Sequence, residues 1–140
     1  MRAFFGSFVE SKFARQVLDP VECTATVDGD VHPASSYSLV VASVVRDVGL
    51  GLRVTYRAAE SRERFHVVAS GLAPKELGFQ MLRVLGGRPL VGEPRIDTLA
   101  GSLRVDFTHE GGAYVLDGEL LRAQWASVVS GPVLRLLVGP

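Results

Sequence analysis

The stretch Leu103-Arg104-Val105-Asp106-Phe107-Thr108 decides the fold, because apolar and polar side chains alternate through it without a break. Successive side chains of a β-strand point to opposite faces, so this period of two predicts a strand with one buried face. Gly101 precedes the stretch and Gly111-Gly112 follows it, which predicts turns on both sides. We therefore expect antiparallel strands that are joined by short connections.

Further strands are expected on both sides of this stretch. Pro94 to Leu99 precedes Gly101, and Ala113 to Leu116 follows the glycine pair. The Asp117-Gly118 step is a strong hairpin signal, and Leu120 to Val129 is the expected return strand. The apolar run Leu134 to Val138 predicts a last strand.

The first half of the chain has the same character. Val21 to Val27 is rich in β-branched residues and runs into a second hairpin signal, Asp28-Gly29-Asp30. Three more strands are expected. They are a buried, valine-rich strand over Tyr37 to Val45, a strand over Leu50 to Tyr56 that is entered through Gly49 and Gly51, and a strand over Phe65 to Ala69. A charged loop from Arg57 to Arg64 is expected between the second and the third of these strands.

Two helices are expected among these strands. One starts near Pro74 and stops at Gly86-Gly87, with apolar residues on one face. That apolar face comprises Leu77, Met81, Leu82, Val84 and Leu85. The other covers Phe4 to Val17 and ends at Asp19-Pro20, and its phenylalanines could pack on the domain's own sheet, touch lipid or touch another domain.

The fold class that follows is mainly β, a β-sandwich-like single domain over residues 1–140 with about two helices. Fifteen basic residues balance fifteen acidic ones, which argues against a nucleic-acid partner. The lone Cys23 fits a small core residue in a reducing, cytoplasmic compartment. No stretch is long and apolar enough to cross a bilayer, and the start lacks the pattern of a signal peptide, so membrane contact would be peripheral.

Several common kinds of binding site can be excluded because the sequence lacks their motifs. The sequence has no Gly-x4-Gly-Lys-Ser/Thr phosphate loop, no Gly-x-Gly-x-x-Gly motif and no cysteine and histidine cluster for zinc. The three histidines, His32, His66 and His109, lie in unrelated segments without a nucleophile nearby in sequence. We expect each of them to be a surface or turn residue.

Asp117 and Glu119 are the candidate catalytic residues, in the segment Leu116-Asp117-Gly118-Glu119-Leu120. Positions two apart on a strand point to one face, so both carboxylates could aim at the same place. Such a pair can act as a base and its orienting partner, because one carboxylate raises the proton affinity of the other. A plain hairpin turn with solvated acids would explain the same residues.

The order of these features resembles the carboxy-terminal domain of the bacterial diacylglycerol kinase and sphingosine kinase-like lipid kinase family. The resemblance implies that Asp117 is the base that takes the proton of a lipid hydroxyl as that oxygen attacks the γ-phosphate of ATP, with Glu119 as its partner at the interdomain cleft. The segments that carry the resemblance are Ala25-Thr26-Val27-Asp28-Gly29, Tyr37 to Val45, Ala73 to Leu85, Leu116-Asp117-Gly118-Glu119 and Val133 to Pro140.

Two departures from the family pattern limit what this chain can do alone. The Gly-Gly-Asp-Gly-Thr loop of the family's amino-terminal ATP-binding domain is absent. We therefore expect the chain alone to bind no cofactor and to be inactive, while ATP and Mg²⁺ belong to the complete kinase. In the stretch Tyr56 to Val67, where family members can hold a structural magnesium, Arg57, Arg62 and Arg64 dilute the acids, so we expect no metal there.

The expected partners are an amino-terminal nucleotide-binding domain, in the same longer chain or separate, and a lipid acceptor such as diacylglycerol or a sphingoid base. An alternative is a stand-alone β-sandwich module that binds a lipid or a protein without catalysis. Its support is the phenylalanine-rich start and the apolar run Leu39 to Val45. A purely structural interaction domain, with the acids in a solvated turn, is the third possibility.

Overall fold

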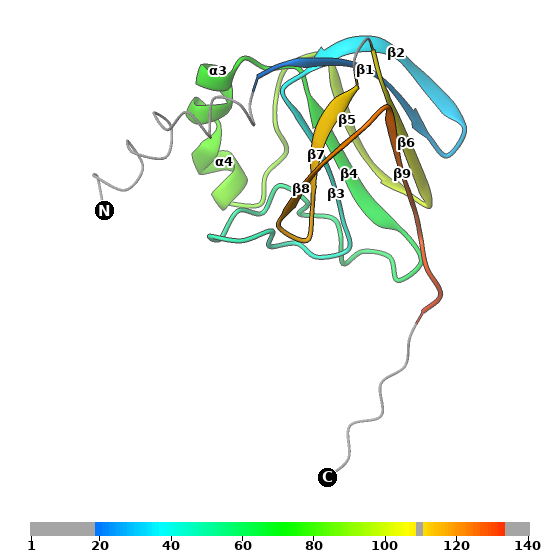
Figure 1. Cartoon of the computed structure of the whole chain (residues 1–140). Coiled ribbons are helices and arrows are strands. Elements are labelled where there is room, and N and C mark those ends of the chain that lie inside the picture. Colours follow the sequence, from blue (N-terminus) through cyan, green and yellow to red (C-terminus); the bar gives the residue numbers. More distant parts are fainter. Residues whose placement is uncertain (1–18, 109–110, 134–140) are drawn as a thin grey trace.

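The computed structural model describes residues 19–108 and 111–133. This part is mainly β and resembles a β-sandwich, as the sequence predicted, with two short helices at one side (Figure 1). The strands are β1 (Val21–Val27), β2 (Asp30–Tyr37), β3 (Leu39–Ser43), β4 (Phe65–Ser70), β5 (Arg95–Ala100), β6 (Ser102–Phe107), β7 (Gly112–Leu116), β8 (Glu119–Ala123) and β9 (Trp125–Val129), and the helices are α3 (Pro74–Phe79) and α4 (Met81–Leu85).

The first sheet has the strand order β2-β1-β6-β9, and all of its neighbours are antiparallel. The alternation in β6 is confirmed, because Leu103 and Val105 are buried while Arg104 is exposed. Ala25 of β1 lies opposite Val105 and is itself fully buried. Alternate positions of β1 and β6 therefore supply one wall of the core.

The second sheet has the order β3-β4-β5 and faces the first across the main core. Every residue of its central strand β4 is buried, so both faces of this sheet are covered. The main core is formed by Cys23, Ala25, Val27, Tyr37, Phe65, Val67, Ala69, Ile96, Ala100, Leu103 and Val105, with Val40, Ala42 and Phe107 packed against it. The predicted core position of Cys23 is confirmed.

The hairpin between β1 and β2 is confirmed at Asp28-Gly29. These residues have φ angles of 49° and 91°, as a two-residue hairpin turn with positive φ at both positions requires. The Asp28 carboxylate accepts hydrogen bonds from the N–H groups of Gly101 (2.9 Å) and Ser102 (2.8 Å). The turn is therefore tied to the connection between β5 and β6.

The single buried strand predicted over Tyr37 to Val45 is wrong, because the chain changes sheets at Ser38. The Ser38 N–H donates to the carbonyl of Ser70 (3.0 Å), and its hydroxyl donates to the carbonyls of Ser70 and Leu72. Tyr37 ends β2 in the first sheet, whereas β3 begins at Leu39 in the second and is only half-buried. One residue thus connects the two layers.

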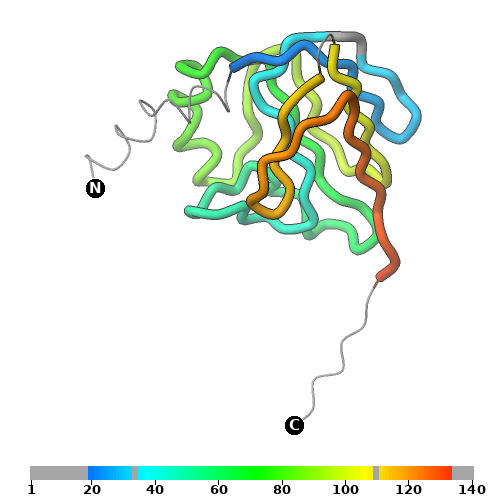
Figure 2. The backbone as a smooth tube through the Cα atoms, in the orientation of Figure 1, coloured from blue at the N-terminus to red at the C-terminus, as the bar shows by residue number. Residues whose placement is uncertain are grey.

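The strand predicted over Leu50 to Tyr56 is also wrong, and turns take its place. Gly49, Leu50 and Gly51 have φ angles of 114°, 55° and 74°, which a strand cannot accommodate. The Thr55 hydroxyl donates to the carbonyl of Val45 (2.7 Å) and so links the two ends of this segment of turns. The predicted loop over Arg57 to Arg64 is confirmed, and Figure 2 shows the whole connection between β3 and β4 along the lower side of the molecule.

The helix predicted after Pro74 is present but divided at Gln80, which has φ −87° and ψ 0°. At this break the Gln80 side chain forms two hydrogen bonds with the backbone of Val91. Its Oε1 atom accepts the Val91 N–H at 2.7 Å, and its Nε2 atom donates to the Val91 carbonyl at 2.6 Å. The predicted end at Gly86-Gly87 is confirmed, with φ 64° at Gly87. Leu82 is 82% exposed, so it does not belong to the packed face.

A second, smaller core fills the space between the helices, the β3–β4 connection and the outer face of the second sheet. Val68, Val84 and Leu90 form it, with Leu39, Leu52, Val54 and Leu77 packed against them. The second sheet is therefore sandwiched between two apolar layers, which explains why β4 is buried at every position.

The return strand predicted over Leu120 to Val129 is two strands, because its halves pair with different partners. β8 pairs with β7 and forms a separate two-stranded ribbon, whereas β9 pairs with β6 at the edge of the first sheet. The chain bends at Gln124, whose carbonyl accepts the N–H of Phe107 (3.0 Å). The predicted helix over Phe4 to Val17 and the predicted strand over Leu134 to Val138 lie outside the described residues.

Candidate functional site

The structure places both candidate acids at the tip of the β7–β8 ribbon. Asp117 and Gly118 form the turn, with φ angles of 49° and 88°, so the predicted hairpin is confirmed. Glu119 is the first residue of β8 and lies opposite Leu116. Asp117 is therefore in the turn itself, and the alternation rule for strand positions does not relate its direction to that of Glu119.

The two faces of the ribbon differ in their surroundings. Directly opposed residues of an antiparallel pair share a face, so Tyr114 and Leu121 lie on one side and Val115 and Leu120 on the other. The first pair is half-buried, whereas Val115 and Leu120 are 54% and 57% exposed. Glu119 belongs to the face of Leu121, two residues further along the strand. The ribbon thus presents an exposed apolar pair beside its acidic tip.

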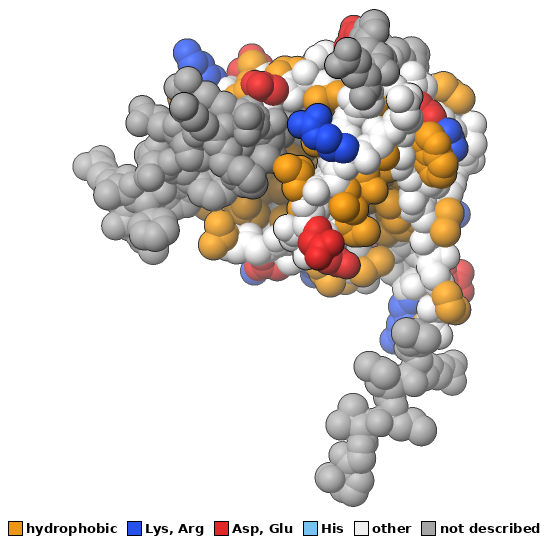
Figure 3. Space-filling view, in the orientation of Figure 1, with side chains coloured by type: hydrophobic (Ala, Val, Ile, Leu, Met, Phe, Trp, Pro, Cys, Tyr) orange, Lys and Arg blue, Asp and Glu red, His pale blue; other side chains and the backbone are white. Residues whose placement is uncertain are grey.

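The carboxylates of Asp117 and Glu119 are both exposed, and neither takes part in a hydrogen bond or an ion pair with the described residues. Figure 3 shows acidic side chains over the lower end of the ribbon, with hydrophobic side chains beside them. The two acids have room to meet a ligand or another domain. Their catalytic role, inferred from the resemblance, stays a prediction.

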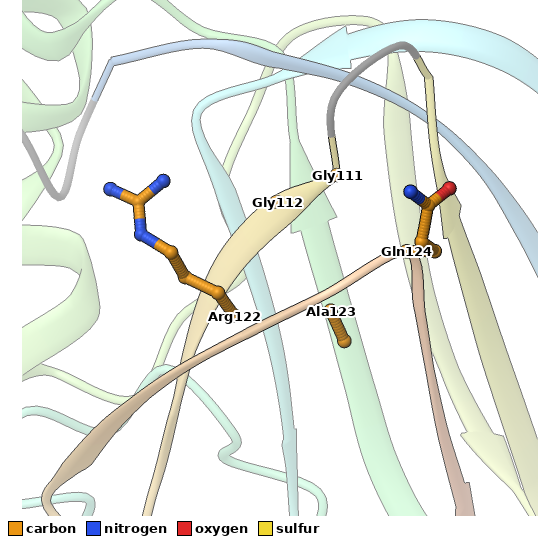
Figure 4. Close-up of a pocket in the computed structure, with 5 residues that line it drawn as sticks. All are labelled: Gly111, Gly112, Arg122, Ala123 and Gln124. Atoms are coloured by element: carbon orange, nitrogen blue, oxygen red, sulfur yellow. The ribbon is translucent and has the colours of Figure 1, made fainter.

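A hollow of about 200 Å³ lies at the base of the ribbon (Figure 4). It is lined by Gly111, Gly112, Arg122, Ala123 and Gln124. A Cβ atom at Gly112 would come within 2.2 Å of the Phe107 ring, and one at Gly111 within 2.8 Å of the Ala123 carbonyl oxygen. The two glycines therefore permit the close approach that seats the ribbon against the end of β6.

A buried polar network that the sequence interpretation missed lies on the outer face of the second sheet. His66, in β4, is fully buried, so the prediction of a surface or turn histidine is wrong. Its Nε2 atom lies 2.8 Å from Oδ1 of Asp97 in β5, and the Asp97 side chain is 11% exposed. The Tyr56 hydroxyl donates to Oδ2 of Asp97 at 3.0 Å. These two bonds join the β3–β4 connection and β4 to β5, which is more than 30 residues away in sequence.

The remaining contacts fix the orientation of the imidazole ring. Nδ1 of His66 accepts the N–H of Arg57 at 3.3 Å, so the ring proton is assigned to Nε2, which donates to Asp97. The Tyr56 ring meets the His66 ring edge-on, with 5.1 Å between centroids. Burial, and then the hydrogen bond to Asp97, raises the pKa of the Tyr56 hydroxyl above its ordinary value. Tyr56 therefore remains a protonated donor at neutral pH.

A sequence signal for this network does exist, although it is faint. His66 interrupts the apolar run from Phe65 to Ala69, which predicts a strand, and Asp97 interrupts the predicted strand from Pro94 to Leu99. A polar residue inside an apolar strand is buried when both faces of the sheet are covered, and it then requires a partner. His32, in contrast, is a partly exposed residue of β2, and His109 lies outside the described residues.

The described residues do not fit a structural magnesium in the stretch Tyr56 to Val67. Glu60 is paired with Arg57, with 3.1 Å between Oε2 and Nε. Within residues 19–108 and 111–133, no group of three or more histidine, cysteine, aspartate or glutamate side chains is placed to hold a metal ion. A hard divalent cation needs several oxygen ligands, which this loop does not bring together.

Among the described residues, no helix has the length and apolar character needed to span a membrane.

The comparisons with protein families and with curated proteins identify no relative of this chain. No protein-family model and no curated protein matches the chain. Its function must therefore be inferred from its own residues.

Proposed function

We propose that this chain is the acceptor-side, carboxy-terminal domain of a lipid kinase. The observation that carries the proposal is the pair of unengaged acids, Asp117 and Glu119, at the exposed tip of a ribbon that pairs with neither sheet. In this proposal Asp117 is the base and Glu119 its partner at the interdomain cleft. The resemblance described above, carried by an ordered set of segments, supports the same assignment.

The chemistry of phosphoryl transfer suits an exposed carboxylate of this kind. The attacking hydroxyl must be positioned and must lose its proton, while the charge on the transferred phosphoryl group is neutralised. Asp117 can accept that proton because no described residue already occupies its oxygens. ATP and Mg²⁺ would be held by the amino-terminal nucleotide-binding domain, in the same longer chain or in a separate one. The chain alone should therefore be inactive.

The surroundings of the two acids favour a lipid alcohol over a small polar acceptor. Val115 and Leu120 form an exposed apolar pair near the tip on the face opposite to Glu119, and Leu116, on the same face as Glu119, is 55% exposed next to the turn. Removal of such side chains from water favours contact with an acyl chain. The kinase would meet its acceptor at a membrane surface as a cytoplasmic, peripheral protein, which also suits the free, buried Cys23.

Turnover in a complete kinase, formed by joining the chain to its nucleotide-binding half, tests the assignment. We expect Asp117→Asn to lower kcat by about 10²–10⁴-fold with little change in KM, because a proton acceptor acts in the transition state. The measurement is transfer of the γ-phosphate of ATP to diacylglycerol or sphingosine in mixed micelles.

Asp28→Asn is the matched control, since Asp28 occupies the same position of an equivalent turn and should leave kcat within a few-fold of the wild-type value. Unchanged turnover of Asp117→Asn would remove this residue from the mechanism. Phosphorylation of a lipid by the isolated chain would contradict the proposal that a separate domain holds ATP and Mg²⁺. Lipid binding by the isolated chain, without any effect of the acids in the complete kinase, would favour the stand-alone binding module.

A further inference from the structure

A second hollow, of about 420 Å³, lies between the β3–β4 connection and the end of α4. Its volume falls within the range of small-molecule sites, about 300–1,000 Å³. The connection and the helix end are held together by the smaller core, because Leu52 and Val54 pack against the cluster to which Val84 belongs. The lining residues are Arg46, Asp47, Arg53, Tyr56, Gly86 and Gly87.

The charges in this hollow leave a net positive site. Arg46 and Arg53 are exposed, and within the described part of the chain neither guanidinium forms a hydrogen bond or an ion pair. Asp47 is the acidic lining residue, and its Oδ1 atom already accepts the N–H of Gly49 at 2.9 Å. The charged residues that line the hollow are thus two arginines and one partly engaged aspartate.

The backbone at the end of α4 keeps the hollow open but offers no donors. The N–H of Gly86 donates to Leu82, and that of Gly87 donates to Val84. A Cβ atom at Gly87 would lie 3.7 Å from both Arg53 Cδ and Tyr56 Cβ, so a larger side chain would extend into the space between them. Recognition of a ligand must therefore come from the arginine side chains.

Tyr56, which lines the hollow, is held in place by the buried network. Its hydroxyl donates to Asp97, which also accepts from His66, so the ring is held at the edge of the hollow. A side chain that is already ordered loses little conformational entropy when a ligand binds against it. The hollow is therefore lined by Tyr56, which the buried network holds in place, and by two exposed arginine side chains.

We propose that this hollow binds a phosphate monoester that also carries a hydroxyl group. Arg46 and Arg53 would hold the phosphate oxygens, because the guanidinium fork matches phosphate geometry. The free oxygen of Asp47 would accept the ligand hydroxyl, and Tyr56 would pack against the carbon skeleton. This site is separate from Asp117 and Glu119 and does not depend on the proposed lipid-kinase function.

Binding of glycerol 3-phosphate to the full chain tests the proposal, followed by amide chemical shifts and by calorimetry. We expect saturable binding with the largest shifts at Gly86, Gly87 and the neighbouring loop. Arg46→Gln and Arg53→Gln should each weaken binding about tenfold, the loss expected for one charged hydrogen-bonding partner, and the double variant should abolish it. Tyr56→Phe should weaken binding less, since it keeps the ring.

Arg62→Gln is the matched control, because Arg62 is an exposed arginine of the same connection outside the hollow. The proposal is overturned if the ligand fails to saturate the wild-type chain, or if Arg62→Gln weakens binding as much as Arg46→Gln does. Co-sedimentation with vesicles that contain lysophosphatidate distinguishes the source of the phosphate. Vesicle binding lost in the double variant supports a lipid headgroup, and binding of glycerol 3-phosphate alone supports a soluble phosphate monoester.

Discussion

The two Asp-Gly turns of this domain are almost identical in backbone shape but differ in what their carboxylates contact. Asp28 and Asp117 both have a φ angle of 49°, and the glycines that follow have φ angles of 91° and 88°. Each turn joins two antiparallel strands through two residues. The local sequence alone is sufficient to produce this geometry.

The difference lies in the tertiary surroundings of the two turns. The Asp28 carboxylate accepts three hydrogen bonds from the β5–β6 connection, two from N–H groups and one from the Ser102 hydroxyl. The Asp117 carboxylate accepts none from the described residues, and it lies at the exposed tip of a ribbon that pairs with neither sheet. The same two-residue motif therefore supplies a structural tie in one place and an unengaged acid in the other, and only the second is available for chemistry.

A third aspartate extends the comparison to a buried carboxylate and should give the largest effect on stability. Asp97→Ala removes the acceptor of His66 Nε2–H and of the Tyr56 hydroxyl, which leaves one buried and one partly buried donor without a partner. We expect a loss of about 3 kcal/mol in the free energy of unfolding, measured by urea denaturation. Asp106→Ala, at a half-exposed aspartate that pairs with Arg104, is the control, and an equal loss there would contradict a special role for the buried network.

Asp28→Asn should have an intermediate effect that depends on pH. The Ser102 N–H, more than any other group, holds the pKa of Asp28 below its ordinary value, so the ionised carboxylate stabilises the folded state. This stabilisation is present above the unfolded-state pKa and is lost as the pH falls through the folded-state pKa. We expect a loss of less than about 1 kcal/mol at pH 7, because solvent screens an exposed carboxylate, and this loss should shrink below about pH 4.

Asp30→Asn provides the control for this pH dependence, since Asp30 borders the same turn but its side chain forms no hydrogen bond with the described β5–β6 connection. Urea denaturation at several pH values compares the three proteins. A difference between Asp28→Asn and the wild-type protein that stays constant from pH 7 to pH 3 would contradict the charge-dependent tie.

Asp117→Asn should have the smallest effect on stability. The side chain is exposed and unengaged within the described part, so the free energy of unfolding should change by less than about 0.5 kcal/mol. Thermal and urea denaturation at neutral pH measure this change directly. A loss as large as that of Asp28→Asn would show that Asp117 has a structural partner, and the turnover experiment would then no longer isolate catalysis.

Features that depend on neighbouring residues in the sequence were predictable. The alternation in β6, both Asp-Gly hairpins and the helix end at Gly86-Gly87 are local properties of the chain. The sheet that a strand joins is, in contrast, not a local property of the chain. Nothing in Tyr37 to Val45 marks Ser38 as the crossing point, because its role depends on the Ser70 carbonyl, 32 residues away. The bend at Gln124 likewise reflects two different pairing partners.

The candidate sites show the same division. The acids of the ribbon tip were predicted from a short motif, since turn and carboxylates lie within three residues. The network of Tyr56, His66 and Asp97 is not apparent from the sequence, because its members come from three segments and because the composition of Leu50 to Tyr56 predicts a strand. Burial of a histidine depends on layers that cover both faces of its sheet, and those layers are built from distant parts of the chain.

The independence of the β7–β8 ribbon has a consequence for how such a domain can diverge. Because the ribbon pairs with neither sheet, its strands can lengthen without disturbing a ladder of the sandwich. Two added residues in each strand would carry Asp117 and Glu119 about 7 Å further out and keep every side chain on its original face. Insertions or deletions in one hairpin could therefore match the reach of these acids to acceptors of different size, while the cores keep their packing.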